Sequence, residues 1–487
     1  MTKRLSWFTL LATACSTATP PSDATPDERA ADVPFVDSRA DGEVADRVEL
    51  DATAGEDAAL DAPAPDTMLD AATRPDAPIN DADPTMPRCV PLGAPTGRVV
   101  RVTPAQADML PSIVAAATTG TTIVLEDGTY RSTAVGESAR RIQFNTAGVT
   151  MRSASNNASA VVIDAAYMTN EAITVHASNV VLAHFTVQRA IDHPIHVTPP
   201  AGSTGIRSVV LYGLRVVDGG EQFVKVNSNG ANAWVDDGRV ECSSFVMTDA
   251  GRTRVERNPG GCYTGGIDAH GARGWTVRDN RFDGIYCAGE GLAEHAIHFW
   301  VGSRETLVEN NIIVDCARGI GFGLVQSGSA RTYADNPYPG VSFVGHYDGI
   351  IRNNVIAASI RFFDTGVELA QARGARVYHN TVYAAPSSTG FFSPIDYRFA
   401  NTVVDIRNNL VSRAVTRRDG AMGTVSNNGE MAAGALFVDP ASADFHLRST
   451  ASSAIDRGVV VAESGRDIDG VAHNRGAPDL GADEYLP

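Results

Sequence analysis

The sequence has almost no lysine and no long apolar segment. Its 487 residues contain Lys3 and Lys225 as the only lysines, and arginine supplies the other fixed positive charges. The net charge is −17 and no stripe of basic residues is present, so nucleic-acid binding is not expected. After the N-terminus no apolar run is long enough to span a bilayer. The chain also has no CxxC pair, which argues against a cysteine-bound zinc ion.

The N-terminus has the pattern of an export signal. A basic start and a short apolar core precede Cys15. This order resembles a bacterial lipoprotein signal over residues 1–15. It predicts Cys15 as the lipid anchor of an outer-membrane or cell-surface protein that contacts the membrane only through that anchor. Residues 12–14 also suit an ordinary signal-peptidase site, so plain secretion remains the alternative.

Residues 16–88 are rich in Ala, Asp, Pro and Thr and contain almost no aromatic residues. They hold about 18 acidic and about 5 basic residues, which accounts for most of the net charge of the chain. Such a segment cannot bury enough apolar surface to offset the entropy lost on ordering. We therefore expect a disordered tether without a chemical role.

A short phrase, apolar-x-x-Asn-x-apolar, recurs five times in the second half of the chain. Its apolar residues alternate as in a strand, and the copies begin about 26 to 43 residues apart, which is one supersecondary unit per repeat. The recurring asparagines are Asn280, Asn311, Asn354, Asn380 and Asn409. An amide at the same turn of every repeat can bond to the amides above and below it. The repeat therefore predicts an all-β fold, a stacked parallel β-solenoid of about ten coils over residues 89–440.

The two ends of the expected solenoid differ from its repeats. Residues 110–117 predict a short helix just before the first coil at residues 121–130. A helix there would cap the first coil, whose strand edge is otherwise open. Residues 441–487 have a different composition and are expected to form a C-terminal capping segment.

Five cysteines follow the expected export signal, and export favours disulfides. Cys242 and Cys262 flank a stretch rich in Gly, Arg and Pro, which predicts a loop closed by a disulfide at its base. Cys287 and Cys316 follow Asn-containing strands by similar distances, which predicts a second disulfide between adjacent coils. The role of Cys89 is left open.

Each repeat contains a second strand whose inward apolar residues can be aligned from coil to coil. The residue between two inward residues must point outward, because strand side chains alternate. The first outward column reads Thr174, His196, Lys225, Asp268, His298, Gly321 and Glu368. The second column reads His176, Thr198, Asn227, His270, Trp300, Gly323 and Ala370. These columns predict a solvent-facing site, and the two glycines suggest room for a sugar ring over a bare strand.

These features together resemble the pectate-lyase-like superfamily of right-handed parallel β-helix proteins over about residues 105–487. Within it, Glu221 and Lys225 followed by a His-Gly pair at His270 look most like polysaccharide lyase family six. That family cleaves alginate or dermatan-type glycans by β-elimination. It uses a Lys as base, an Arg just before the His-Gly pair as acid, and acidic residues ahead of the Lys for calcium. In this sequence Ala269 stands where the family has that Arg.

The resemblance and the residue chemistry together assign roles. Lys225 is expected to be the base, since lysine can deprotonate usefully and arginine cannot. His298 or His270 would replace the missing arginine as proton donor. Glu221 and Asp218 are the expected calcium ligands. The residues expected to bind the substrate are Asn227, Asp268, Trp300 and Arg304.

The leading functional prediction is a monomeric polysaccharide lyase acting on an acidic, uronate-containing glycan. A non-catalytic, surface-tethered β-helix for glycan binding or adhesion is the first alternative, because the fold alone does not determine function. A glycoside hydrolase is the second, with Asp268 and Glu221 as the two carboxylates that hydrolysis requires.

Overall fold

The structure is a computed structural model that describes residues 89–230, 232–257, 262–289, 291–473 and 476–486. The expected signal with Cys15 and the expected linker at residues 16–88 lie outside the described residues, so lipidation, secretion and disorder stay predictions. None of the helices in the described ranges is long and apolar enough to cross a membrane.

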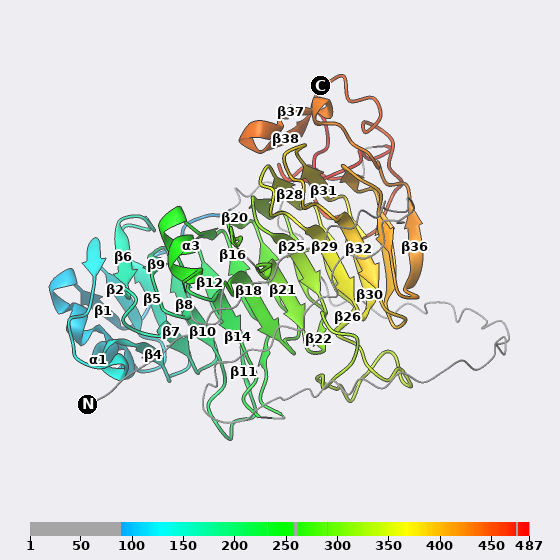
Figure 1. Ribbon diagram of the computed structural model, residues 1–487. Coiled ribbons are helices and arrows are strands. Elements are labelled where there is room, and N and C mark those ends of the chain that lie inside the picture. The colour runs from blue at the N-terminus through cyan, green and yellow to red at the C-terminus, as the bar shows by residue number, and fades with distance from the viewer. Residues whose placement is uncertain (1–88, 231, 258–261, 290, 474–475, 487) are drawn as a thin grey trace, which may run out of the picture. The chain divides into compact units, whose positions relative to one another are not determined.

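Three parallel sheets form the three sides of each coil (Figure 1). Sheet I has ten strands: β4 (Ile142–Phe144), β7 (Glu171–Val175), β10 (His193–Val197), β14 (Gln222–Val226), β18 (Gly265–His270), β21 (His295–Trp300), β25 (Arg318–Phe322), β29 (Thr365–Ala370), β32 (Ser393–Arg398) and β35 (Thr416–Arg417). The ten strands agree with the expected number of coils, and the fold is the expected right-handed parallel β-helix.

Sheets II and III follow sheet I in each coil. Sheet II contains β1 (Val99–Val102), β2 (Thr122–Leu125), β5 (Thr150–Ser153), β8 (Val181–Ala183), β12 (Val210–Tyr212), β16 (Arg239–Glu241), β19 (Thr276–Arg278), β22 (Ser303–Arg304), β23 (Leu307–Glu309), β26 (His346–Tyr347), β27 (Ile350–Arg352), β30 (Ala372–Tyr378), β33 (Val403–Arg407) and β36 (Met422–Ser426). Sheet III contains β3 (Gly128–Tyr130), β6 (Val161–Asp164), β9 (Thr186–Gln188), β13 (Arg215–Val217), β17 (Ser244–Val246), β20 (Arg281–Asp283), β24 (Ile312–Val314), β28 (Val355–Ala358), β31 (Thr381–Ala384) and β34 (Leu410–Val411).

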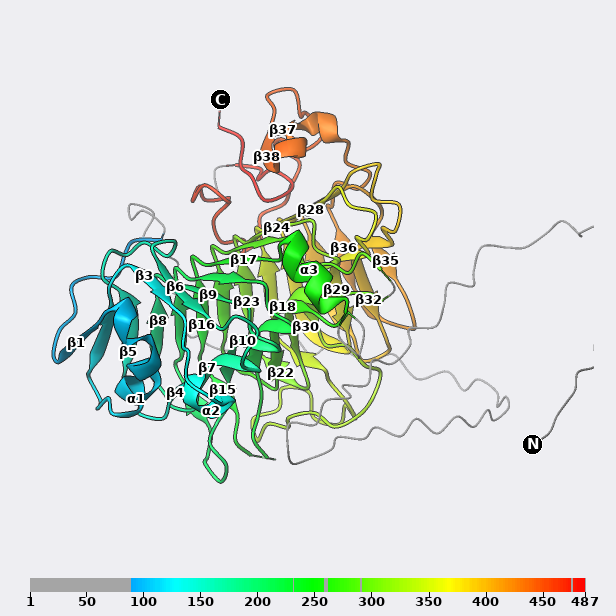
Figure 2. The same cartoon turned by 60° about the vertical axis from the view of Figure 1, so that its left-hand side comes forward.

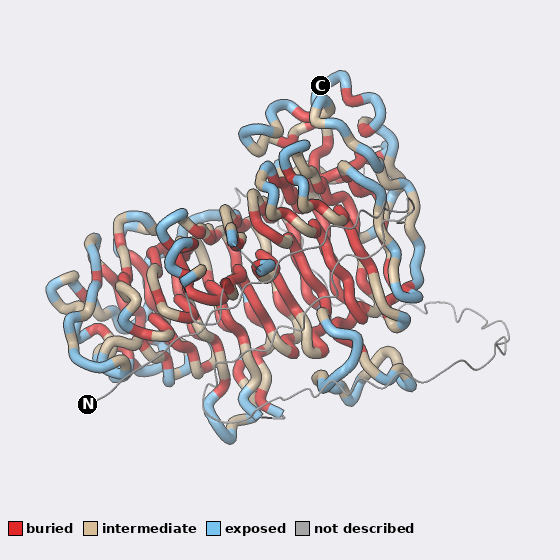
Figure 3. Tube along the Cα trace, viewed as in Figure 1, coloured by how far each residue is buried: buried red, intermediate tan, exposed pale blue. Residues whose placement is uncertain are grey.

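The core runs through the centre of the coils. In sheet I the inward residues lie in register from strand to strand and are completely buried; they include Ile195, Val224, Ile267, Ile297, Ile320, Val367 and Ile395. Figure 3 shows this burial along the strands, with most exposed residues in the turns. Stacking like side chains at one position in every coil lets a short repeat build a continuous core.

The asparagine ladder is confirmed, with each amide bonded to the next. Nδ2 of Asn311 donates to Oδ1 of Asn354 (2.9 Å), and Nδ2 of Asn354 donates to Oδ1 of Asn380 (2.9 Å). The same contact joins Asn280 to Asn311 and Asn380 to Asn409. Asn428 extends the ladder by one more coil and was not identified from the sequence. These amides also bond to backbone groups in the turns, so the ladder satisfies polar atoms that the core would otherwise leave unpaired.

A helix lies at the N-terminal end, as expected. α1 (Leu110–Ala115) follows the 3₁₀ helix η1 (Pro104–Met109) and packs against β4, with Leu110 and Val114 buried. β1 precedes this helix and pairs with β2, so the sheets begin one strand earlier than the sequence indicated. Two further short helices are α2 (Glu137–Arg140) and α3 (Asp249–Val255); α3 lies in the connection between β17 and β18 (Figure 2).

The C-terminal segment packs along the side of the coils. It contains η2 (Gly434–Leu436), β37 (Phe437–Asp439), η3 (Pro440–Ser442) and β38 (Asp444–Leu447). Phe437, Phe445 and Leu480 form an apolar cluster with Val355 and Leu410 of sheet III. The segment therefore differs from the end cap that its composition suggested: it covers the outer face of sheet III, where these strands carry apolar side chains on both faces.

The cysteines pair differently from the prediction. The disulfides are Cys89–Cys242 and Cys262–Cys287, and Cys316 is a buried free thiol. The predicted pairs Cys242–Cys262 and Cys287–Cys316 are therefore wrong. Cys242 lies at the turn between sheets II and III, whereas Cys262, Cys287 and Cys316 lie between sheets III and I on three successive coils. The middle one, Cys287, bonds to the cysteine of the preceding coil and not to that of the following coil.

Candidate active site

The two outward columns predicted for sheet I exist in the predicted register. Lys225 of β14 pairs with Asp268 of β18, which pairs with His298 of β21. In the second column, His270 pairs with Trp300. Because neighbouring parallel strands lie about 4.8 Å apart, these side chains on successive coils are in contact distance of one another.

The centre of this face is buried, which corrects the expectation that it faces solvent. Lys225 is 5% exposed, Asp268 3% and His298 1%. His270 and Trp300 in the second column are only partly buried. Long side chains in neighbouring columns cover one another, so an outward direction does not give exposure. The accessible part of the site is its border, at His270 and Trp300.

Asp268 joins the residues of the site. Its Oδ2 accepts hydrogen bonds from Nζ of Lys225 (2.6 Å) and from Nε2 of His270 (3.1 Å). Its Oδ1 accepts one from Nε1 of Trp300 (2.8 Å). Burial acts to raise the pKa of this carboxyl, but the charges of Lys225, His270 and His298 hold that pKa well below its ordinary value. Asp268 is thus a permanent carboxylate that positions a lysine, a histidine and a tryptophan.

His298 is not placed to donate a proton to a glycan, contrary to one of the two predicted roles. Its Nε2 donates to the carbonyl oxygen of Gly323 (3.1 Å), and its ring stacks on Trp300. Burial, helped by the nearby His295, lowers its pKa to about 4. The ring of His298 is 1% exposed, whereas His270 is only partly buried, so His270 is the accessible one of the two predicted proton donors.

A further outward column, absent from the sequence analysis, lies at the start of the sheet I strands. It contains Glu171, His193, Gln222, Gly265, His295, Arg318, Thr365 and Ser393. In β21, His295 shares a face with His298, three residues on, and their ring centroids are 4.5 Å apart. Strict alternation would place these two rings on opposite faces, so the strand bends between them.

Gly321 leaves room for this additional column. A Cβ atom at Gly321 would lie 2.8 Å from Nε2 of His295. The missing side chain therefore accommodates a histidine ring of the neighbouring strand, whereas the sequence suggested room for a sugar. At Gly323, with φ +72°, a Cβ atom would meet the carbonyl oxygen of Ala370 at 1.8 Å, so close backbone packing explains that glycine.

The residues expected to bind calcium, Asp218 and Glu221, each have contacts within the protein. Oδ1 of Asp218 accepts from the backbone N–H of Thr248 (2.7 Å), and Oδ2 accepts from the Thr248 hydroxyl (2.9 Å). Asp218 thus fixes the start of α3. Glu221 is buried, with its Oε2 3.8 Å from Nε2 of His193. Calcium binding at these two residues stays a prediction.

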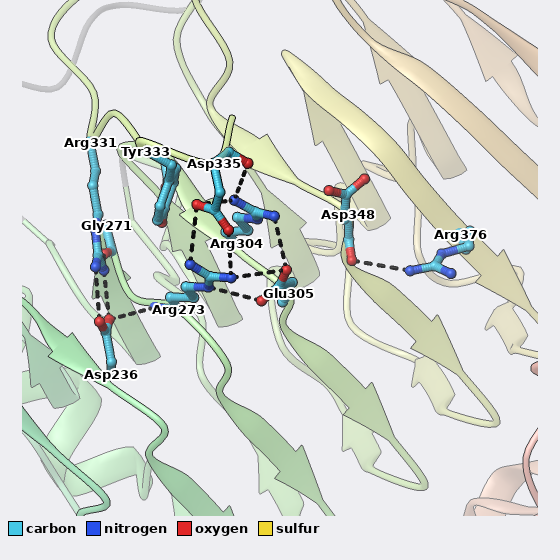
Figure 4. Close-up of polar contacts among 11 residues, drawn as sticks. Asp236, Gly271, Arg273, Arg304, Glu305, Arg331, Tyr333, Asp335, Asp348 and Arg376 are labelled. Atoms are coloured by element: carbon cyan, nitrogen blue, oxygen red, sulfur yellow. Dashed lines mark hydrogen bonds and ion pairs between the residues drawn. The ribbon is translucent and has the colours of Figure 1, made fainter. Parts of the chain in front are cut away.

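Arg304 lies outside the site, which corrects its expected role in substrate binding. It is completely buried in β22 of sheet II. Its guanidinium donates to the backbone and side-chain oxygens of Asp335 and pairs with Glu305 (Figure 4). In the same cluster, Arg331 pairs with Asp236 (Figure 4). Arg304 therefore anchors the insertion after β25 to the coils.

The predicted substrate residue Asn227 lies at the border of the site. It follows β14 directly, is partly buried, and its backbone N–H donates to Val197 (3.1 Å). Its side-chain Oδ1 is buried and makes no hydrogen bond with the residues that the structure describes. Asn227, His270 and Trp300 are accordingly the three predicted site residues that a ligand could reach.

No protein-family model matches this sequence, and a search of curated proteins gives no match. Among solved structures, the chain is similar to pectate lyase Pel9A, with 16% identity over 81% of this chain and 98% of that one, at a TM-score of 0.51. It is also similar to an alginate lyase from Paenibacillus sp. (16% identity, 68% of this chain and 99% of that one, TM-score 0.42). A polygalacturonase from Erwinia carotovora matches at 10% identity, over 71% of this chain and 100% of that one, with a TM-score of 0.35. At these identities the comparison establishes the fold alone, the right-handed parallel β-helix of pectate lyase.

Proposed function

We propose that this protein is an exported polysaccharide lyase that cleaves a uronate-containing glycan by β-elimination at the border of sheet I. The observation that carries the proposal is the buried carboxylate of Asp268, which holds Lys225, His270 and Trp300 together on three successive coils. A cation, a titratable imidazole and an aromatic ring lie at one place, and these are groups that the binding and cleavage of an acidic sugar require.

Lys225 is assigned an electrostatic role from beneath the border of the site, without direct contact with the substrate. An ammonium group 2.6 Å from a buried carboxylate is stabilised in its charged form, which disfavours the role of resting base that the resemblance implied. A positive charge near the uronate carboxylate stabilises the negative charge that develops when the adjacent C5 proton leaves. Lysine therefore contributes as a cation, and another group must move the proton.

His270 is assigned to proton transfer. Its Nε2–H donates to Asp268, so Nδ1 carries the lone pair in the neutral ring. In the proposed reaction Nδ1 takes the C5 proton, the C5–H electron pair forms the C4=C5 double bond, and the C4–O bond breaks. The imidazolium, stabilised by Asp268, then returns the proton to the leaving oxygen. Trp300, in edge contact with His270, offers a ring face for the sugar.

A hydrolase fits this arrangement less well. Hydrolysis needs a protonated carboxyl as general acid, usually one with a raised pKa. The pKa of Asp268 is instead held well below its ordinary value by its cationic neighbours, against the effect of burial. Asp268 is thus a poor general acid.

A non-catalytic glycan-binding module is the second candidate, and the burial of Lys225 favours it. The side chain of Lys225 is only 6% exposed and is already paired with Asp268, so in this second candidate the ion pair has a structural role. A ligand would then bind only to the border residues, without turnover.

The experiment is incubation with a panel of uronate polysaccharides, following the ultraviolet absorbance of the unsaturated product. We expect product with the wild type, a loss of about 10²–10⁴-fold in turnover for His270→Gln, and partial activity for Lys225→Arg, because arginine keeps the cation. His176→Ala is the matched control, since His176 lies in the same column three coils away.

Two outcomes would change the assignment. If Lys225→Arg is inactive while His270→Gln retains turnover, lysine is the base. If the wild type releases no unsaturated product from any uronate polymer but is retarded by one in affinity electrophoresis, the binding module replaces the lyase.

A further inference from the structure

Three potential metal ligands converge on sheet I beside the proposed lyase site. They belong to Glu294, His295 and His298, each of which offers one ligand atom within 4.8 Å of the other two. Oε2 of Glu294 is 3.8 Å from Nδ1 of His295 and 3.7 Å from Nδ1 of His298. Glutamate and two imidazoles are a donor set that zinc sites in proteins use.

Both imidazoles are oriented by a hydrogen bond at their other nitrogen. Nε2 of His295 donates to Oε2 of Glu368 (3.1 Å), and Nε2 of His298 donates to the carbonyl oxygen of Gly323 (3.1 Å). Each bond places a proton on Nε2, so in the neutral rings Nδ1 carries the lone pair. Nδ1 of both rings faces Oε2 of Glu294, and Nδ1 of His298 also lies 3.6 Å from Oδ1 of Asp268. Carboxylate and carbonyl acceptors of this kind are the partners that metal-binding histidines have in proteins.

Two of the three converging atoms make no hydrogen bond with the residues that the structure describes. Oε2 of Glu294 and Nδ1 of His295 are buried and make no hydrogen bond there. The side chain of His295 is only 1% exposed, so solvent does not satisfy it. A buried polar atom without a partner is uncommon and calls for a cause.

The distances from Glu294 to the two histidines are slightly longer than those between two ligands of one ion. At 3.7–3.8 Å, the Glu294 to histidine distances are too long for hydrogen bonds. Two ligands each about 2.0–2.1 Å from a tetrahedral zinc ion lie about 3.4 Å apart. Small side-chain shifts would therefore bring all three atoms to bonding distance.

We propose that Glu294, His295 and His298 bind one zinc ion. Calcium is the less suitable ion, because it prefers oxygen ligands and a larger coordination number. Oδ1 of Asp268 lies 3.6 Å from Nδ1 of His298, but we leave Asp268 out of the set because that oxygen already accepts a hydrogen bond from Trp300. The proposed zinc ligands are different residues from Lys225 and His270. The zinc proposal therefore does not depend on whether the chain is a lyase.

The test is zinc titration by isothermal calorimetry of the untagged chain after dialysis against a chelator. We expect one equivalent of zinc to bind the wild type, and affinity to fall at least about tenfold in Glu294→Gln and further in the double variant His295→Ala/His298→Ala. Gly321→Ala should also weaken binding, because it places a methyl group 2.8 Å from the His295 ring without removing a ligand. Circular dichroism confirms that each variant keeps its β-structure.

His446→Ala is the control, because His446, Asp469 and Asp483 form the other histidine–carboxylate cluster in the described ranges. That variant should keep the full zinc affinity. The proposal is overturned if the wild type binds no zinc, if the double variant binds as tightly as the wild type, or if His446→Ala alone abolishes binding.

Discussion

The ammonium of Lys225 lies 2.6 Å from Oδ2 of Asp268, and the two side chains are only 6% and 5% exposed. Burying two charges costs more desolvation free energy than forming an ion pair at the surface. The attraction between the two charges offsets that cost only while both partners are present. The pair is therefore a poor source of net stability but a sensitive point for substitution.

Asp268→Asn should lower the free energy of unfolding by about 3–5 kcal/mol, because it leaves a buried ammonium beside a neutral amide. Chemical denaturation followed by circular dichroism measures the change. Asp283→Asn is the matched control: Asp283 pairs with Arg281, but both side chains are at least 30% exposed, so the cost should be below about 1 kcal/mol. Equal effects of the two substitutions would show that Asp268 does not hold a buried charge.

Asn354→Ala should destabilise the protein more than Asn428→Ala. Asn354 is completely buried and bonds to amides on both neighbouring coils, whereas Asn428 is partly exposed at the end of the ladder. Each buried polar group left without a partner costs about 1–3 kcal/mol. The measurement is the denaturation midpoint of each variant, and a larger effect at Asn428 would contradict the ladder as a source of stability.

Much of the fold and the central column follow from the sequence because of the repeat. Inward apolar residues align the coils, and the period of two then places Lys225, Asp268 and His298 in one column. The exposure of these three residues could not be predicted, because it depends on the way in which the long side chains of adjacent columns cover one another. Arg304 was misplaced for a related reason: it lies past the end of β21, where the chain has turned into sheet II.

The column that contains His295 was not predicted, for a physical reason that can be recognised in the sequence. The sheet I strands from β7 to β32 bend after their first residue, so residues three apart share a face. The bend coincides with a small residue or proline in most coils, namely Ala172, Pro194, Gly266, Ala296, Gly319, Gly366 and Pro394. That recurrence would have placed His295 beside His298. The cysteine pairs had no such signal, since three cysteines occupy equivalent turns and spacing alone does not choose among them.

Loss of the Cys89–Cys242 disulfide should cost more stability than loss of Cys262–Cys287. The first joins residues 153 apart and the second residues 25 apart. The chain-entropy model gives about 5 and about 3.5 kcal/mol for loops of these lengths. Cysteine-to-serine double variants compared by chemical denaturation provide the measurement, and the reverse order would contradict the entropic account.

Cys316 should resist alkylation in the native protein. It is buried, and burial raises the pKa of its thiol to about 12, so almost no reactive thiolate is present at neutral pH. Peptide mapping after iodoacetamide treatment should find Cys316 labelled only when denaturant is added. Labelling under native conditions would show that the turn between β24 and β25 opens.

The carboxyl of Asp483 should make stability depend on pH. Burial, with further effects from Asp467 and Asp469, raises its pKa to about 6, against hydrogen bonding from Leu447. A carboxyl that binds its proton more tightly when folded adds stability at low pH, and this contribution is lost as the pH rises through 6. The wild type should therefore lose about 2–3 kcal/mol relative to Asp483→Asn between pH 4 and pH 7.

The check is the difference in free energy of unfolding between wild type and Asp483→Asn across that range. His446 lies nearby, and against the effect of burial its hydrogen bond with Asp444 raises its pKa above the ordinary value, so the comparison is repeated in a His446→Gln background. A flat difference in both backgrounds would contradict the raised pKa of Asp483.

The Cys89–Cys242 bond also determines how the molecule carries mechanical load. Tension applied through the chain upstream of Cys89 crosses the sulfur bridge and enters the β-helix at Cys242, at the turn after β16. The covalent path does not pass through the strands from β1 to β16. Fraying or unfolding of those first coils would therefore leave unchanged the length of the covalent path from the upstream chain to Cys242. The tension would act on the later coils, which contain Asp268 and His298.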